Sequence, residues 1–526
     1  MRRRAVLQLA GLAPLLHLAR ASGLELVDDA QAQTALRTPP DLELSLTAAP
    51  GEVSLLPGAP TGVWRFSGTV TRGSASALQA LNGSYLGPVI RVRRGQRVRV
   101  RFLNRLGEPS IVHWHGLEVP ERADGHPRFA VNHGAEYVYD FEVTNRAGTY
   151  WYHPHPHMRT AAQVYRGLAG LLLVSDREED ALGLPAGAGE LLCVLQDRRF
   201  DENNQLVYAG AAAGGGMRRG RARGGAAGMG GMAQMMDTMN GWIGDRMLVS
   251  GRVQPTRDVD RRTYRVRLLN GSNARIYKLA WSDGSPMVVI GGDGGLLERP
   301  RTQRAVTLAP SQRADVLLDL SAHARGSEVR LQSLTFPSAH AGNAAMMMGA
   351  SPPVPQGAPL TLMTLRVSGT QGPRFQAPDR LSVHDFREMA SAPVRRVPLT
   401  FARMNWFLDG RVFDMTDVRE EETVAPGSTH VWEFVNQPNP MGMAMAHPMH
   451  LHGPQFRVLS RAGGSTNALR EGIIDAGWTN TVAVLPGETV RVQVTFSRHP
   501  GLYLYHCHIL EHEDMGMMRN FRIRPQ

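Results

Sequence analysis

The sequence predicts an all-β protein built from three related β-sandwich domains in one chain. It has 526 residues, and at roughly 100–200 residues per domain this length suits about three domains. Glycine (56) and proline (34) are abundant while only 20% of the residues are charged, which favours short strands joined by turns over long helices. Strand-like runs also recur in the same order along the chain, as expected for homologous domains.

One strand-like run occurs three times and ends each time in asparagine. The copies are RRGQRVRVRFLN, RRTYRVRLLN and PGSTHVWEFVN, which end at Asn104, Asn270 and Asn436, at intervals of 166 residues. A second run follows each copy: HGAEYVYDFEV from His133, APSQRADVLLDL from Ala309 and PGETVRVQVTF from Pro486. Each combines a turn signal with alternating apolar and polar residues, which is typical of a half-buried strand.

The repeat predicts three domains, at residues 42–175, 190–368 and 381–526. Glycine- and proline-containing segments at 176–190 and 369–380 are expected to link them. The second domain carries an insertion at 209–239 that is rich in glycine, alanine, arginine and methionine and fits no strand pattern. We expect a surface loop there.

Residues 1–23 are predicted to be an export signal. Three arginines at 2–4 precede a modest apolar stretch, and the small residues at 19–21 fit a cleavage site. The adjacent arginines indicate the twin-arginine route, with an ordinary Sec signal or a frayed tail as alternatives. We therefore expect a periplasmic or secreted protein, without stable membrane insertion because no later apolar run approaches about 18 residues. The net charge of +11 comes from scattered arginines, which gives no reason to expect a nucleic-acid partner.

Ten of the 19 histidines fall into four short motifs, two in the first predicted domain and two in the third. The motifs are HWHG (His113, His115), WYHPH (His153, His155), HPMHLHG (His447, His450, His452) and HCHILEHEDMGM (His506, His508, His512). Residues two apart in a strand point to the same face, so a His-x-His pair places both imidazoles on one side. A single pair would be weak evidence, but four pairs give eight imidazoles that could converge on one metal cluster.

Cys507 lies between two of these histidines, so its sulfur is expected to point away from their rings. Its available companion ligands are His447, His512 and Met517. Two histidines, a cysteine and a weak axial methionine form the ligand set of blue-copper electron-transfer sites, whereas zinc prefers a closed tetrahedral site without the weak thioether. The sequence therefore predicts a copper site joined to the histidine cluster by a short piece of backbone. Cys193 is predicted to be a buried strand residue instead.

These motifs resemble those of the multicopper oxidases, the family of laccases and bacterial cuprous oxidases, over nearly all of the chain after the export signal. The resemblance implies three cupredoxin-like Greek-key domains and four coppers per chain. It assigns the blue copper to His447, Cys507, His512 and axial Met517, the lone copper of a trinuclear cluster to His113 and His450, and the binuclear pair to His115, His153, His155, His452, His506 and His508. The rings of His447 and His512 are implied to lie toward the surface, where a substrate gives up electrons.

The same resemblance implies an oxidase that takes electrons one at a time and reduces dioxygen to water. Cys507 would carry each electron toward the cluster. Asp124 and Glu513 match positions that act as proton relays in similar oxidases. The alternative for each is a carboxylate with only a structural role.

The substrate is left open between small organic reductants and a metal ion. Laccase-like members of the family oxidise phenols and aromatic amines, and cuprous oxidases oxidise Cu(I). Thioethers are soft ligands, so the methionines at 217–239, 346–348 and 441–445 could gather Cu(I), although methionine also fills gaps in cores and loops. Similar cuprous oxidases have an aspartate where this chain has Met443, while Met445 matches the thioether that follows it.

We therefore expect a laccase-like oxidase with cuprous oxidase activity. One alternative is a dedicated cuprous oxidase that serves copper tolerance. Another is a non-catalytic copper carrier, which would need no trinuclear cluster. A monomer is favoured.

Overall fold

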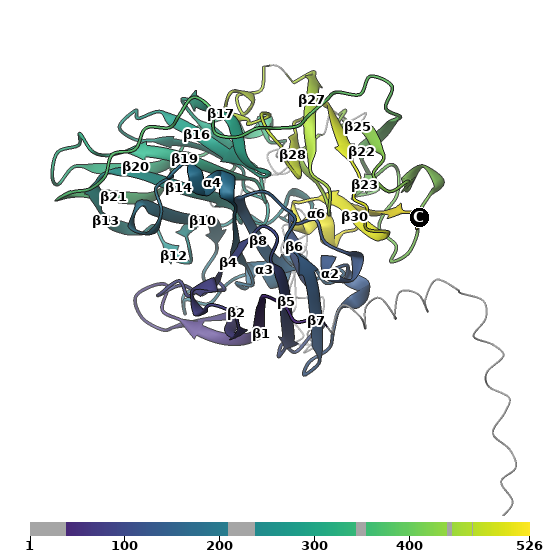
Figure 1. Cartoon of the computed structure of the whole chain (residues 1–526), viewed down its shortest axis with the longest axis horizontal. Helices are drawn as coiled ribbons and strands as arrows, with labels where there is room; N and C mark the ends of the chain where they lie inside the picture. Colours follow the sequence, from purple (N-terminus) through teal and green to yellow (C-terminus); the bar gives the residue numbers. More distant parts are fainter. Residues whose placement is uncertain (1–37, 209–236, 343–353, 439–443, 465, 526) are drawn as a thin grey trace, which may run out of the picture.

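The protein is all-β, as its sequence predicts. The computed structural model describes residues 38–208, 237–342, 354–438, 444–464 and 466–525. Strands make up 46% of it and helices 9%. The strands form six sheets, and each of three successive stretches of the chain contributes two of them, which gives three cupredoxin-like sandwiches (Figure 1). No helix in these ranges is both long enough and apolar enough to cross a membrane.

The first sandwich contains the purple and blue strands of Figure 1. One sheet has the order β2-β1-β5-β7, with β1 (Leu42–Val53), β2 (Thr61–Arg72), β5 (Arg97–Asn104) and β7 (Glu136–Glu142). The other has the order β3-β4-β9-β8-β6, with β3 (Leu78–Gln79), β4 (Val89–Arg93), β6 (Val112–His115), β8 (Gly148–Pro154) and β9 (Gly170–Ser175). Three short helices accompany them: α2 (Glu121–Asp124), α3 (Thr160–Tyr165) and α4 (Arg177–Ala181).

The second sandwich contains a seven-stranded and a five-stranded sheet. The larger has the order β12-β11-β10-β14-β19-β16-β17, with β10 (Glu190–Arg198), β11 (Arg246–Val249), β12 (Arg252–Val253), β14 (Thr263–Asn270), β16 (Met287–Gly292), β17 (Gly295–Gln303) and β19 (Arg313–Asp319). The smaller has the order β13-β21-β20-β15-β18, with β13 (Thr256–Arg261), β15 (Tyr277–Trp281), β18 (Val306–Leu308), β20 (Glu328–Ser333) and β21 (Leu360–Gln371).

The third sandwich contains two five-stranded sheets. One has the order β23-β22-β25-β29-β27, with β22 (Val394–Ala402), β23 (Asn405–Leu408), β25 (Thr429–Val435), β27 (Phe456–Ala462) and β29 (Thr489–Thr495). The other has the order β24-β31-β30-β26-β28, with β24 (Thr423–Val424), β26 (His447–Leu451), β28 (Thr481–Val484), β30 (Gly501–Cys507) and β31 (Met518–Ile523). Helix α6 (Leu510–Asp514) follows β30.

The threefold repeat predicted from the sequence recurs in the strand pairing. The first run of each copy forms β5, β14 and β25, and the second run forms β7, β19 and β29. In every copy these two strands pair antiparallel. On its other edge, the first-run strand pairs parallel with the opening strand of its sandwich, β1, β10 or β22. The three sandwiches therefore share the same three-strand core in one of their sheets: β1-β5-β7, β10-β14-β19 and β22-β25-β29.

The repeated asparagine anchors the chain where it leaves the first-run strand. Asn104, Asn270 and Asn436 are all buried, and each side-chain amide donates to at least two backbone carbonyls of neighbouring loops or strand ends. A buried carbonyl without a donor costs about 1–3 kcal/mol, so one amide that serves two carbonyls fixes both loops. This role explains why the repeat ends in asparagine in all three copies.

The sandwiches pack against one another through buried apolar residues. One cluster joins the first and second sandwiches and includes Leu86, Trp151, Leu192 and Leu269. Another joins the second and third and includes Ile276, Phe336, Leu469 and Leu485. Helices α3 and α6 connect the first and third sandwiches through Ala161, Val164 and Leu510. This contact lies near the middle of the molecule, beside β6, β8 and β30 (Figure 1).

Some predictions concern residues outside the described ranges. These are the export signal at 1–23, most of the insertion at 209–239, the methionines at 346–348, and Met441 and Met443.

Candidate metal centre

The strand register brings the histidine motifs together in pairs. In the first sandwich β6 pairs antiparallel with β8, which sets His113 opposite His153. In the third sandwich β26 pairs antiparallel with β30, which sets His450 opposite His506. Only the pair on β6 lies wholly within a strand, since β8, β26 and β30 each end inside a His-x-His pair. Strict strand alternation therefore explains one pair, and the ends of the other strands position the remaining rings.

The predicted ligands gather in four buried groups. Three consist of histidines alone: His113, His115 and His153; His113, His450 and His452; and His155, His452 and His506. The fourth consists of His447, Cys507 and His512. Within each group the candidate ligand atoms lie within 4.8 Å of one another. His508 lies beside the first group, with its ring centroid 5.0 Å from that of His115 and 5.3 Å from that of His153.

Burial keeps these imidazoles neutral. Removal from water lowers the pKa of every one of the ten motif histidines, to about 4 for His506 and about 3 for His153 and His512. A neutral imidazole has one N–H and one bare nitrogen, and only the bare nitrogen can bind a metal.

Backbone carbonyls identify the bare nitrogen in several rings. His113 Nδ1 lies 2.6 Å from the carbonyl oxygen of Asp124, and His450 Nδ1 lies 2.6 Å from that of Asn480. A carbonyl can only accept, so each Nδ1 carries the hydrogen and each Nε2 is bare. Nδ1 of His153 and of His506 likewise faces a carbonyl, at 2.9 and 3.0 Å. His153 Nε2 has no hydrogen-bond partner among the residues that the structure describes.

The bare nitrogens face one another. His113 Nε2 and His450 Nε2 are 3.5 Å apart, and neither has a hydrogen to share. Two lone pairs at this distance repel in a buried site, and a cation held between the rings removes that repulsion. Imidazole nitrogens suit copper, so the donor set of the cluster fits the predicted metal.

In His115 the hydrogen lies on the other ring nitrogen, Nε2. Its Nε2 lies 3.1 Å from Oδ1 of Asn480, while its buried Nδ1 has no partner within the described ranges. Nε2–H therefore donates to the amide oxygen, and Nδ1 is the nitrogen left for a metal. Asn480 was not identified from the sequence, and it lies 365 residues from His115 along the chain.

The Cys507 group has the donors of a blue-copper site. Cys507 Sγ lies 3.5 Å from His447 Nδ1 and 3.6 Å from His512 Nδ1. His512 Nε2–H donates to the carbonyl of Met239 at 2.9 Å, which leaves its Nδ1 bare. Met517 is fully buried in the same apolar cluster as Cys507. A thiol, two imidazoles and a nearby thioether are the soft and borderline donors that copper prefers.

The histidines of this group are covered, in contrast to the surface position that the family resemblance implied. His447 and His512 are both 0% exposed. The ring of Trp406 lies 4.6 Å from that of His447 and 5.1 Å from that of His512, and its indole N–H donates to the same Met239 carbonyl. Trp406 therefore packs against both rings, and the Met239 carbonyl accepts from His512. Trp406 was not identified from the sequence, and Met239 was identified only as one of the methionines at 217–239.

Both predicted relay carboxylates touch the histidine cluster. Asp124 Oδ2 lies 2.7 Å from His452 Nδ1, and Asp124 is fully buried. Glu513 contacts two rings, with Oε1 3.4 Å from His155 Nε2 and Oε2 3.2 Å from His506 Nδ1. Burial raises the pKa of both carboxyl groups well above the ordinary range.

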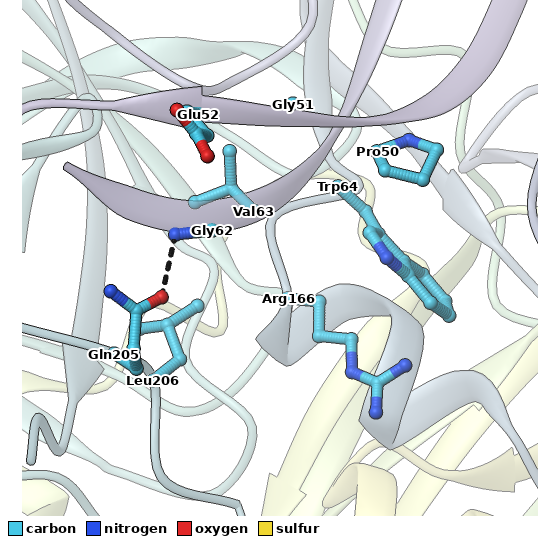
Figure 2. A pocket seen from close by; sticks show the side chains of 9 residues that line it. All are labelled: Pro50, Gly51, Glu52, Gly62, Val63, Trp64, Arg166, Gln205 and Leu206. Carbon is cyan, nitrogen blue, oxygen red and sulfur yellow. Dashed lines mark hydrogen bonds between the residues drawn. The ribbon is translucent and has the colours of Figure 1, made fainter.

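Other features lie apart from the metal ligands. Cys193 is a buried residue of strand β10, as expected. Met445 is 6% exposed and packs in the third sandwich's apolar cluster. A surface cavity of about 510 Å³ lies between Pro50, Val63 and Leu206, with the Arg166 guanidinium 4.3 Å from the Trp64 ring (Figure 2). None of its lining residues is a candidate ligand.

Known proteins are similar to this chain in both sequence and fold. Family models described as multicopper oxidase match residues 66–179 and 389–526. The multicopper oxidase mco of Staphylococcus haemolyticus is 30% identical over 84% of this chain and 83% of its own length. The crystal structure of the McoA multicopper oxidase from Aquifex aeolicus matches with a TM-score of 0.73 and 34% identity, over 93% of this chain and 97% of that one. The crystal structure of a laccase from Pediococcus acidilactici matches with a TM-score of 0.72 and 32% identity, over 93% of this chain and 92% of the laccase chain.

Proposed function

The chain belongs to the multicopper oxidase family, and we propose on that premise that it oxidises small reductants one electron at a time and reduces dioxygen to water. The observation that carries this proposal is the buried meeting of bare imidazole nitrogens from the first and third sandwiches, 3.5 Å apart between His113 and His450. A protein with this fold that bound no metal would have no need for two buried imidazole lone pairs that face each other.

We assign the copper ligands by position. His447, Cys507 and His512, with Met517, would hold the electron-entry copper. His113 and His450 would hold one copper of the cluster, and His115, His153, His155, His452, His506 and His508 would hold the other two. Bound copper would accept single electrons from the reductant and pass them to dioxygen.

The backbone connects the electron-entry site to the histidine cluster, and burial excludes water from both. Cys507 ends β30 directly after His506 and directly before His508, so one short piece of backbone links the entry site to the cluster. The cluster imidazoles are at most 1% exposed, which keeps bulk water away from the reacting centre. Trp406 and the Met239 backbone cover the entry site, so a donor that stays outside would pass its electron through them.

Asp124 and Glu513 would deliver the protons that water formation needs. Asp124 contacts His452 and Glu513 contacts His155 and His506, which supports this proposal because all three rings belong to one histidine group. A raised pKa lets a buried carboxyl hold a proton near neutral pH and release it when charge changes nearby.

We propose phenols and aromatic amines as substrates, together with Cu(I). The buried entry site supports electron transfer from a donor that does not reach the metal. The cavity lined by Met445, Asn240 and Ile509 has a volume of about 10 Å³, which is room for about one water molecule and not for a phenol. A role for Met443 and Met445 in binding Cu(I) stays a prediction. Such a Cu(I) site would favour a dedicated cuprous oxidase.

Initial rates of oxygen uptake by the copper-loaded protein, with a phenol and with Cu(I) side by side, test this proposal. Uptake with both reductants is expected above the rate of uncatalysed oxidation. Uptake with Cu(I) alone would favour the dedicated cuprous oxidase. Copper binding without oxygen uptake from either reductant would contradict the proposal and favour a copper carrier.

We also propose that the protein acts outside the cytoplasm, because arginines 2–4 and the apolar stretch after them are typical of a twin-arginine signal. Fractionation of cells that carry the chain with these arginines replaced by lysine checks it. Retention in the cytoplasm is the expected result.

A further inference from the structure

Arg313 connects the second sandwich to the histidine cluster, although none of the histidine groups draws on that sandwich's described residues. It begins β19, and its side chain is buried. Its Nε donates to the carbonyl of Thr149 in the first sandwich at 3.1 Å. Its Nη1 donates to Oδ1 of Asn480 in the third sandwich, also at 3.1 Å. One guanidinium therefore reaches both sandwiches that supply the ligands.

Asn480 in turn holds two ligand rings. Its Oδ1 accepts from Nε2 of His115, and its backbone oxygen accepts from Nδ1 of His450. These two rings come from different sandwiches and stack, with centroids 3.8 Å apart and planes 13° from parallel. The side chain and the backbone of one residue therefore set the orientation of a stacked pair of candidate ligands.

The direction of the Asn480 amide decides which nitrogen of His115 can bind a metal. With Oδ1 toward the ring, His115 Nε2 carries the hydrogen and Nδ1 is bare. If the amide turned over, its NH₂ group would face the ring, Nε2 would have to accept, and the hydrogen would move to Nδ1. The second arrangement removes the lone pair that the cluster uses.

We propose that Arg313 is a positioning residue that holds the Asn480 amide in the metal-competent direction. A guanidinium has only donors, so it binds the amide oxygen and opposes the NH₂ group. In the turned-over arrangement the amide NH₂ would meet the N–H of Arg313 with no acceptor between them. Arg313 thus selects the tautomer of His115 without touching a metal ion.

Neighbouring residues leave space for the contact between Arg313 and Asn480 and balance its charge. A Cβ on Gly116, which follows His115 with a φ of +89°, would lie 2.5 Å from Nδ2 of Asn480 and 3.1 Å from Nη2 of Arg313. The glycine of the HWHG motif thus leaves room for both groups. The Asp293 carboxylate accepts from the backbone N–H of Arg313 at 2.7 Å and lies 3.4 Å from Nη1, which offsets the buried charge.

The inference rests on the proposed copper binding and is tested by how firmly the copper-loaded full-length protein holds its metal. Copper retained per chain is measured against increasing chelator concentration. Arg313→Met should lose cluster copper at a chelator concentration about 10–100-fold lower than the wild type, the usual effect of removing an outer hydrogen bond from a metal site. Arg198→Met is the matched control, because Arg198 is a buried arginine of the same sandwich that also donates to a first-sandwich carbonyl, that of Val164.

Asn480→Asp separates positioning from general stability. A carboxylate accepts through both oxygens and has no wrong direction, so Arg313→Met in an Asn480→Asp background should retain copper as firmly as Asn480→Asp alone. If Arg313→Met does not fold, Arg313→Lys in the same two backgrounds gives the comparison. An equal copper loss in Arg313→Met and Arg198→Met, or a loss that Asn480→Asp does not cancel, would overturn the inference. A wild-type protein that binds no copper would overturn the proposed function instead.

Discussion

At the scale of single residues, the chemistry depends on which atom of each side chain is left without a hydrogen. Carbonyl oxygens fix the hydrogen on Nδ1 in His113 and His450 and on Nε2 in His512. The bare nitrogen of each ring then points toward its group of ligands. This selection, more than the mere presence of histidine, is what would let a set of buried rings bind a metal.

Replacing Cys507 by serine should remove the blue colour and the oxidase activity while the protein stays folded. The hydroxyl is a hard and weak ligand, and it replaces the sulfur through which the proposed copper would connect to the backbone of His506 and His508. Visible absorption, oxygen uptake and circular dichroism of the copper-loaded variant check this. A blue and active variant would contradict the assignment of Cys507.

Replacing Glu513 by glutamine should slow turnover without loss of copper. Glutamine keeps the shape of the side chain but cannot release a proton, and proton transfer by a positioned group is worth about 10²–10⁴-fold in rate. Steady-state kcat is measured together with copper content. Asp514→Asn is the control, because the carboxylate of Asp514 accepts from backbone N–H groups of α3 and not from a ligand ring. Equal kcat values for both variants and the wild type would exclude a relay role for Glu513.

At the scale of elements, the repeated strand and its terminal asparagine set the frame for the ligands. Asn270 is the copy best suited to a stability test. Its carbonyl partners, Arg275 and Leu308, both lie in the second sandwich, whose described residues supply none of the candidate ligands. Asn270→Ala should lower the free energy of unfolding by about 2–4 kcal/mol, since it leaves two buried carbonyls without donors. Chemical unfolding measures this. The exposed Asn203→Ala is the control, and an equal change in both would show that the asparagine anchor is unimportant.

Much of this frame could be predicted from the sequence because it is local and periodic. Alternation and the 166-residue interval predicted the strands, and the structure pairs them as β5 with β7, β14 with β19, and β25 with β29. The His-x-His spacing likewise indicated the cluster. The contacts around the ligands could not be predicted, because Arg313, Asn480, Met239 and Trp406 meet their partners only after the sandwiches pack. Nothing in the local sequence marks Arg313, Asn480 or Trp406, and Met239 was noted only for its thioether, not for its backbone carbonyl.

At the scale of the whole molecule, the site lies where the sandwiches meet, so its protonation affects the stability of the fold. Burial holds the pKa of all ten motif histidines below the unfolded value of 6.5. The unfolded chain therefore binds more protons than the folded chain once the pH falls through 6.5. In the part of the chain that the structure describes, six carboxyls act in the opposite direction because burial raises their pKa values, but they are fewer than the ten histidines: Glu118, Asp124, Asp293, Glu511, Glu513 and Asp514.

The metal-free protein should consequently lose stability as the pH is lowered from 7 to 5. The free energy of unfolding is unaffected by these histidines above their unfolded pKa of 6.5. It falls as the pH drops below 6.5 and continues to fall toward the folded pKa values near 3–4. The copper-loaded protein should be less sensitive, since a ligating nitrogen cannot take a proton until the metal leaves. Melting temperatures of both forms across this range check the expectation. Equal pH dependence of the two forms would contradict the assignment of these rings as ligands.

The ratio of electrons donated to dioxygen consumed tests the central proposal most directly. Oxidised phenol and oxygen uptake are measured together on the copper-loaded protein, with an assay for hydrogen peroxide. Complete reduction to water requires four electrons for each dioxygen, so we expect about four phenol molecules oxidised by one electron per dioxygen, with no peroxide. A ratio of about two with peroxide as the product, or phenol oxidation without oxygen uptake, would contradict a cluster that reduces dioxygen to water.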